Sequence, residues 1–157
     1  MRKTIINSVS AANFPSGQTW LDLERLTQVE ITSENSAHPV EAALVPGEGP
    51  GWRAGQPGEQ TIRVIFDHPL RLRRIFLRFD EKEQARTQEF ELRWLPEGQE
   101  HSREIVRQQY TFSPPDTIEE VEDYRVDLNG VTTLEVKIVP DISRGGAYAS
   151  LTQMRLA

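Results

Sequence analysis

The sequence of 157 residues contains no cysteine. This absence excludes disulfide cross-links, thiolate metal sites and thiol catalysis. It fits a reducing compartment, so we expect a cytoplasmic protein. A chain of this length buries enough surface to fold without a covalent or metal cross-link. We therefore expect a single domain over residues 1–157.

Long hydrophobic runs are also missing. The longest uninterrupted apolar run, Ala42–Val45, has four residues, whereas a membrane-spanning helix needs about 20. The start Met1-Arg2-Lys3 resembles a secretory signal, but Asn7 and Ser8 interrupt the stretch before an apolar core develops. We expect neither a membrane span nor a signal peptide.

The sequence has fewer basic than acidic residues, with 18 Lys and Arg against 24 Asp and Glu and a formal net charge of −6. Nucleic acids and anionic membrane surfaces are bound largely through clusters of Lys and Arg. We therefore expect no nucleic-acid partner and no membrane partner.

Motifs that carry catalysis are absent from the sequence. It has no Gly-x-Ser-x-Gly elbow, no phosphate-binding glycine loop and no His-Glu-x-x-His pair. The three histidines are far apart, and His68 and His101 lie beside charged residues, as solvated histidines do. We expect a protein that is not an enzyme, with no catalytic residues, no metal and no cofactor.

What the sequence does have is hydrophobic alternation with a period of two, which indicates strands with one packed and one wet face. Adding segments 29–33, 103–112 and 149–156 to the alternating ones gives about eight strands. The alternating apolar sets are Ile62, Val64 and Phe66; Ile75, Leu77 and Phe79; Phe90, Leu92 and Trp94; Tyr124, Val126 and Leu128; and Leu134, Val136 and Ile138.

The ten glycines and ten prolines all lie between these predicted strands, where residues that break strands belong. Asn129-Gly130 predicts a hairpin, because both residues tolerate positive φ, and Glu97-Gly98 predicts a second turn. A short helix is predicted over Thr19–Leu26, with Thr19 as its N-cap. Many short strands with regular turns predict an all-β, antiparallel sandwich.

Five segments follow one another in a characteristic order after Val29. They are Thr32–Leu44, Gly51–Ala54, Pro69–Phe79, Phe90–Trp94 and Tyr148–Leu156. In order and spacing they resemble the discoidin or coagulation factor 5/8 type C family of galactose-binding-like domains. The resemblance implies a jelly-roll β-sandwich over residues 29–157. Residues 1–28 lie outside the resemblance, and we expect them to form an N-terminal extension packed on the sandwich.

The resemblance implies binding through loops at one end of the sandwich, without chemistry. Relatives bind sugars, lipid head groups, proteins or, more rarely, nucleic acid, and the fold alone does not choose among these. Sugar-binding relatives often hold calcium with an Asp-rich first loop and a Glu in the last strand. Here the loop Leu44–Pro50 has no Asp, and Gln153 stands at the last-strand position. Calcium prefers charged oxygen ligands, so we expect no calcium site.

Four residues are the candidate ligand-binding set, provided that folding brings their loops together: His38, Arg53, Arg144 and Tyr148. Tyr148 follows the flexible basic sequence Arg144-Gly145-Gly146, and an aromatic ring there can stack on a sugar or a peptide. Trp52 resembles a tryptophan that closes the end of the core in the family, so we expect it to be structural and Arg53 to be exposed.

Two further clusters of charge have competing interpretations. Arg74, Phe76 and Arg78 would share the outer face of a strand, either as a basic aromatic patch or as arginines paired with acids such as Glu89 and Glu91. The acidic run over residues 119–123 is interpreted as a solvated loop.

These observations favour a carbohydrate-binding module that holds its ligand at the loop end. The alternative is an intracellular protein–protein interaction domain of the same fold, because exposed aromatic and Arg side chains are also what protein interfaces favour. The expected partner is thus a glycan or a protein.

Calcium tests the interpretation of the first loop and Gln153. A ligand raises the melting temperature only where it binds the native state, so calcium at about 1 mM should leave the melting temperature unchanged. A rise of several degrees that a chelator reverses would contradict this expectation.

Overall fold

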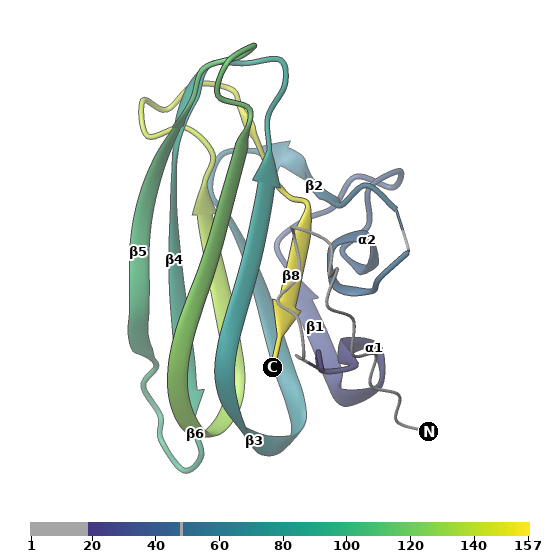
Figure 1. Ribbon diagram of the computed structural model, residues 1–157, viewed down its shortest axis with the longest axis vertical. Coiled ribbons are helices and arrows are strands. Elements are labelled where there is room, and N and C mark those ends of the chain that lie inside the picture. The colour runs from purple at the N-terminus through teal and green to yellow at the C-terminus, as the bar shows by residue number, and fades with distance from the viewer. Residues whose placement is uncertain (1–18, 48) are drawn as a thin grey trace, which may run out of the picture.

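The computed structural model describes residues 19–47 and 49–157. Eight strands and two helices of four residues each follow one another along the chain (Figure 1). Neither of these helices is long enough to cross a membrane. The elements are α1 Leu23–Leu26, β1 Thr27–Ile31, α2 Glu41–Leu44, β2 Trp52–Pro57, β3 Gln60–Asp80, β4 Arg86–Pro96, β5 Arg103–Phe112, β6 Glu119–Val139, β7 Tyr148–Leu151 and β8 Gln153–Leu156.

Two strands, β3 and β6, are long enough to take part in both layers of the sandwich. The first arm of β3 pairs with β1, and its second arm pairs with β8. Both arms of β3 also pair with β6, and the register shifts between Ile65 and Arg74. Figure 1 shows each strand reversing its direction at the lower end of the molecule.

These bends fold one hydrogen-bonded sheet into two packed layers. One layer has the order β1, β3, β6, β4, β5, and the other contains β8 with the second arm of β3 and the first arm of β6. The rings of Phe79 and Phe90 stack with centroids 5.2 Å apart, although Phe90 pairs with Ile138, which in turn pairs with Gln60 at the far end of β3. Only a folded sheet allows that contact.

The hairpin predicted at Asn129-Gly130 is wrong in its pairing. The chain reverses there, and Gly130 has a φ of 68°, but the two arms do not pair with each other. Tyr124 pairs with Ile75 and Leu134 with Val64, so both arms of β6 pair with β3. The dipeptide therefore lies at a bulged corner between the layers.

The expectation that every glycine and proline lies between strands is also wrong. Pro69 lies inside β3 at its corner, Gly130 inside β6, and Gly55 and Pro57 inside β2. Irregular positions within a strand use the same residue types as turns, since both interrupt the regular ladder. The predicted turn at Glu97-Gly98 is confirmed, because the Gln99 N–H donates to the Pro96 carbonyl over 3.1 Å.

The predicted faces of the strands are confirmed by their burial. Eight residues of the alternating apolar sets have no exposed surface, namely Val64, Ile75, Leu77, Phe79, Leu92, Leu134, Val136 and Ile138. Trp94, also predicted to be inward, is half-buried and lies beneath the Arg103 guanidinium. The period-two pattern thus assigned side chains to the core even where the strand ends were misplaced.

The outer face predicted for Arg74, Phe76 and Arg78 is not open. Arg74 and Phe76 are 6% and 3% exposed, and the Trp20 ring lies 6.3 Å from the Phe76 ring. Arg74 pairs with Asp123, and Arg78 pairs with Asp80 and Glu119. The partners predicted for these arginines, Glu89 and Glu91, pair instead with Arg107, because β6 and β8, not β4, flank this arm of β3.

The helix predicted from Thr19 begins later, at Leu23, because Asp22 caps it by accepting the Arg25 N–H over 3.3 Å. Before the helix, the Leu21 N–H donates to the Leu156 carbonyl over 2.8 Å. Of the predicted extension 1–28, residues 1–18 lie outside the described part of the chain.

The acidic run over residues 119–123 is the start of β6 and not a solvated loop. Glu120 is 1% exposed and accepts a hydrogen bond from Gln88 Nε2 over 3.1 Å. Burial raises the pKa of the Glu120 carboxyl to about 9, and the neighbouring Glu122 adds to the increase. The carboxyl is therefore neutral inside the sandwich at ordinary pH.

Replacing either of two central core residues should destabilise the sandwich. Leu77→Ala or Leu92→Ala removes a fully buried side chain, which should lower the free energy of unfolding by about 2–5 kcal/mol. Chemical denaturation measures this change. Unaltered stability in both variants would mean that the strand faces are reversed.

Glu120 should make stability depend on pH. Its folded pKa of about 9 exceeds its ordinary value of 4.5, so the folded state binds the extra proton between these values and the Glu120 contribution to stability falls as pH rises through this window. The melting temperature of Glu120→Gln, relative to that of wild type, should therefore rise as the pH increases from about 5 to about 9. Each kcal/mol of stability corresponds to a shift of about 2–4 °C.

Glu100→Gln is the matched control for this experiment, because Glu100 is exposed in the β4–β5 turn. Its melting temperature relative to wild type should not change with pH. An equal pH dependence in both variants would show that Glu120 ionises as a solvated carboxyl does.

Candidate functional site

The end of the sandwich opposite the strand corners carries the two-stranded sheet of β2 and β7 (Figure 1). Alternation along β2 turns Trp52 and Ala54 inward and Arg53 outward. Trp52 is 1% exposed, and its Nε1 donates to the Ser33 carbonyl over 3.1 Å. Trp52 therefore closes the core, as its resemblance to the family implied, and Arg53 is exposed, as predicted.

Arg53 and Tyr148 lie together on the outward face of this small sheet. The Arg53 guanidinium carbon lies 5.6 Å from the centroid of the Tyr148 ring, within the range of a cation–π contact. Tyr148 is 40% exposed. Arg53 forms no ion pair within residues 19–47 and 49–157. We call this pair, Arg53 and Tyr148, the platform.

The turn that carries His38 is bonded directly to the platform strand. The Arg53 N–H donates to the His38 carbonyl over 3.1 Å, and the Asn35 N–H donates to the Arg53 carbonyl over 2.8 Å. The backbone thus fixes the distance between half-buried His38 and the platform.

The turn approaches β2 so closely that position 55 requires glycine. A Cβ at Gly55 would lie 2.7 Å from the Glu34 carbonyl oxygen, and the Gly55 N–H donates to Ser33 Oγ over 2.9 Å. The Gly-Trp-Arg-Ala-Gly sequence therefore holds the 33–38 segment against the strand that carries Arg53.

Arg144 lies in the loop between β6 and β7, four residues before Tyr148. It is exposed and has a φ of 67°, a left-handed conformation that costs a non-glycine residue about 1–2 kcal/mol. The Arg144 N–H donates to the Asp141 carbonyl over 3.0 Å. Hydrogen bonds from Ser143 lower the pKa of Asp141 and hold its carboxylate within the loop.

Folding thus joins three of the four predicted ligand-binding residues through direct contacts, and it places Arg144 in a neighbouring loop. His38 touches Arg53 through the backbone, and Arg53 touches Tyr148 through the side chain. That these residues bind a ligand remains a prediction.

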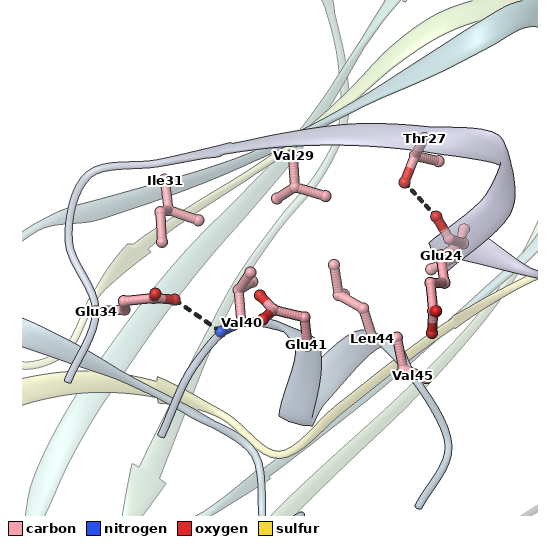
Figure 2. Close-up of a pocket in the computed structure, with 10 residues that line it drawn as sticks. Glu24, Thr27, Val29, Ile31, Glu34, Val40, Glu41, Leu44 and Val45 are labelled. Carbon is pink, nitrogen blue, oxygen red and sulfur yellow. Dashed lines mark hydrogen bonds between the residues drawn. The ribbon is translucent and has the colours of Figure 1, made fainter. Parts of the chain in front are cut away.

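A groove of about 390 Å³ lies between β1 and α2. Figure 2 shows Val29 and Ile31 of β1 pointing toward Leu44 of α2 across it. Its floor is aliphatic, and its lining includes three carboxylates, Glu24, Glu34 and Glu41. Glu34 accepts the Val40 N–H over 2.9 Å at one end (Figure 2).

Sequence reasoning missed this groove. Its walls come from α1, β1, α2 and the segment after β1, and only the folded chain places them opposite one another. The available signals were the alternation of Val29 and Ile31 and the apolar run Ala42–Val45, and neither identifies its partner.

The groove and the platform have opposite chemistry on two sides of one turn. Glu34 and Val40 line the groove, and His38 lies between them in sequence. The groove is acidic and aliphatic, and the described residues that line it include no basic and no aromatic side chain. The platform combines a guanidinium with an aromatic ring.

No group of three or more His, Cys, Asp or Glu side chains is arranged to hold a metal ion among the residues that the structure describes. The Oε1 atom of Gln153, at the last-strand position, is buried without a hydrogen-bond partner in the described chain. Glu48, in the first loop, lies outside the described residues.

No protein-family model matches the chain, and no curated protein matches it. Solved structures do. A family 32 carbohydrate-binding module of Clostridium perfringens, in complex with GalNAc-β-1,3-galactose, matches 88% of this chain and 99% of its own with a TM-score of 0.64 at 13% identity.

Two further solved structures are similar. A pectin-binding carbohydrate-binding module matches 84% of this chain and 90% of its own, with a TM-score of 0.61 and 12% identity. An F5/8 type C domain of Bacteroides fragilis matches 90% and 97%, with a TM-score of 0.60 and 13% identity. The chain therefore has the galactose-binding-like β-sandwich fold of these domains, and the predicted fold class is confirmed.

Proposed function

We propose that this protein is a non-catalytic carbohydrate-binding module that holds a glycan on the platform, with His38 and Arg144 contributing at its edges. The observation that carries the proposal is the exposed Tyr148 ring beside the Arg53 guanidinium at one end of the sandwich. Solved domains of the same fold support it, because they include modules in complex with galactose and with GalNAc.

The chemistry of the platform suits a sugar. The apolar face of a pyranose packs on an aromatic ring, and polar groups at the edge bond its hydroxyls. Arg53 offers up to five N–H donors, and an imidazole such as that of His38 can both donate and accept. The β2–β7 ladder and the buried Trp52 fix these groups on a rigid support.

The groove suits a sugar less well. Its aliphatic floor, in the part of the chain that the structure describes, offers no ring for a pyranose face to stack on. Its glutamates can accept hydrogen bonds from hydroxyls, but they offer no donor. We therefore assign the glycan to the platform.

A protein partner is the second candidate function. Exposed tyrosine and arginine side chains are enriched at the energetically important centres of protein interfaces, and the platform presents both. A glycan array with the purified protein separates the two functions, because only the first predicts saturable binding to free sugars.

Tyr148→Ala tests the platform. Loss of the ring should weaken glycan binding by about 1 kcal/mol or more, measured by titration calorimetry with the best array glycan. The melting temperature should change little, because Tyr148 is 40% exposed.

Val121→Ala is the matched control, since Val121 is 44% exposed and lies on β6, which pairs with β3 and β4 and not with the platform strands β2 and β7. It should bind the glycan as wild type does. Normal binding by Tyr148→Ala, or an equal loss in both variants, would contradict the assignment of the glycan to the platform.

A further inference from the structure

Arg53 forms no ion pair within the described residues, whereas half of the described arginines, all on the large sheet, do. Arg63 pairs with Glu30 and Glu135, and Arg71 pairs with Asp127. The chain has more acidic than basic side chains, so partners are plentiful. Within the described residues, Arg53 nonetheless contacts an uncharged ring, and its positive charge is not balanced by a carboxylate of the protein.

The nearby carboxylates are engaged elsewhere or face another direction. Glu59, two residues after the β2 position that pairs with Tyr148, lies 4.0 Å from Lys137. Asp141, in the loop before Tyr148, accepts hydrogen bonds from the N–H and Oγ of Ser143. Glu34, before the His38 turn, accepts the Val40 N–H and lines the groove on the other side of that turn. The remaining ionisable groups of the two flanking segments, His38 and Arg144, are bases.

A guanidinium is planar, and its N–H groups point outward in that plane, so they stay available when an aromatic ring covers one face. Two of these N–H groups match the two oxygens of a carboxylate and can form two parallel charge-assisted hydrogen bonds with it. A sugar hydroxyl offers only a neutral, single contact. The uncompensated charge of Arg53 therefore gains most from a ligand that brings a carboxylate.

We propose that the glycan bound on the platform is acidic, with its carboxylate held by Arg53 and its ring packed on Tyr148. This inference rests on the proposed function and specifies its ligand class. Sugars of the uronic acid type have this chemistry, since the carboxylate is attached directly to the pyranose that stacks on the ring.

The test compares two ligands with the same sugar rings, trigalacturonate and its methyl ester, whose carboxyl groups are free in the first and esterified in the second. Titration calorimetry measures their binding to the full chain at about pH 7, where a carboxyl of ordinary pKa is ionised. The acid should bind about tenfold more tightly than the ester, the ratio expected for charge-assisted hydrogen bonds. Raising the salt from about 0.05 M to about 1 M should shrink the ratio, because salt screens exposed charges.

Substitutions at position 53 separate charge from shape. Arg53→Gln should bring the ratio of the two affinities close to one, and Arg53→Lys should leave an intermediate ratio, because lysine keeps the charge but lacks the fork. Tyr148→Ala should weaken the binding of both ligands. Melting curves identify any variant that fails to fold.

Arg103→Gln is the matched control. Arg103 is also exposed and also lies over a ring, 5.8 Å from the centroid of Trp94, but it follows the β4–β5 turn, at the end where β3 and β6 bend (Figure 1). It should keep the full preference for the acid. A ratio that collapses in Arg103→Gln but survives in Arg53→Gln would overturn the inference.

The inference and the proposed function fail in different ways. Equal affinity for the acid and the ester, or an array that is positive only for neutral glycans, overturns the acidic ligand and leaves the carbohydrate-binding module standing. An array with no glycan bound overturns both.

Discussion

The sandwich depends on two strands that belong to both of its layers. Because β3 and β6 run through their corners without leaving the ladder, each layer is anchored to the other by continuous backbone and by contacts such as that of Phe79 with Phe90. The corners fix one end of the molecule. The opposite end needs no such continuity, so it accommodates β2, β7 and the connecting loops, and a platform can be built there without disturbing the layers.

The sequence predicted the faces of the strands better than their connections. Alternation is a local property, and a side chain such as Leu77 keeps its inward direction whichever strand it pairs with. Pairing is not local. Asn129-Gly130 has the composition of a hairpin, but the partner of each arm is β3, whose paired residues lie 39 to 78 positions away in sequence. The glycine and proline signals were real, since the chain does change direction there, but they do not distinguish a turn from a bulged corner.

In the candidate site, too, some features could be predicted from the sequence and others could not. The resemblance to a known family placed Arg53 and Tyr148 at the loop end, and the pairing of β2 with β7 brings them into contact. The groove between β1 and α2 could not be predicted, because the sequence of each wall does not indicate which segment lies opposite it. Arg74 and Phe76 were misplaced on an open face, because the cover from Trp20 depends on how the segment before β1 packs.

Charged side chains are neutralised in different ways on the long strands, in the interior and on the platform. Arginines of the long strands are mostly matched with acids across the ladder, as Arg63 is with Glu135 and Arg74 with Asp123. Two groups that form no ion pair within the described residues have opposite outcomes. Glu120 is buried and stays neutral by holding a proton, whereas a guanidinium stays charged. Arg53 therefore keeps its charge in an exposed position beside Tyr148, and the acidic glycan that we propose would balance it.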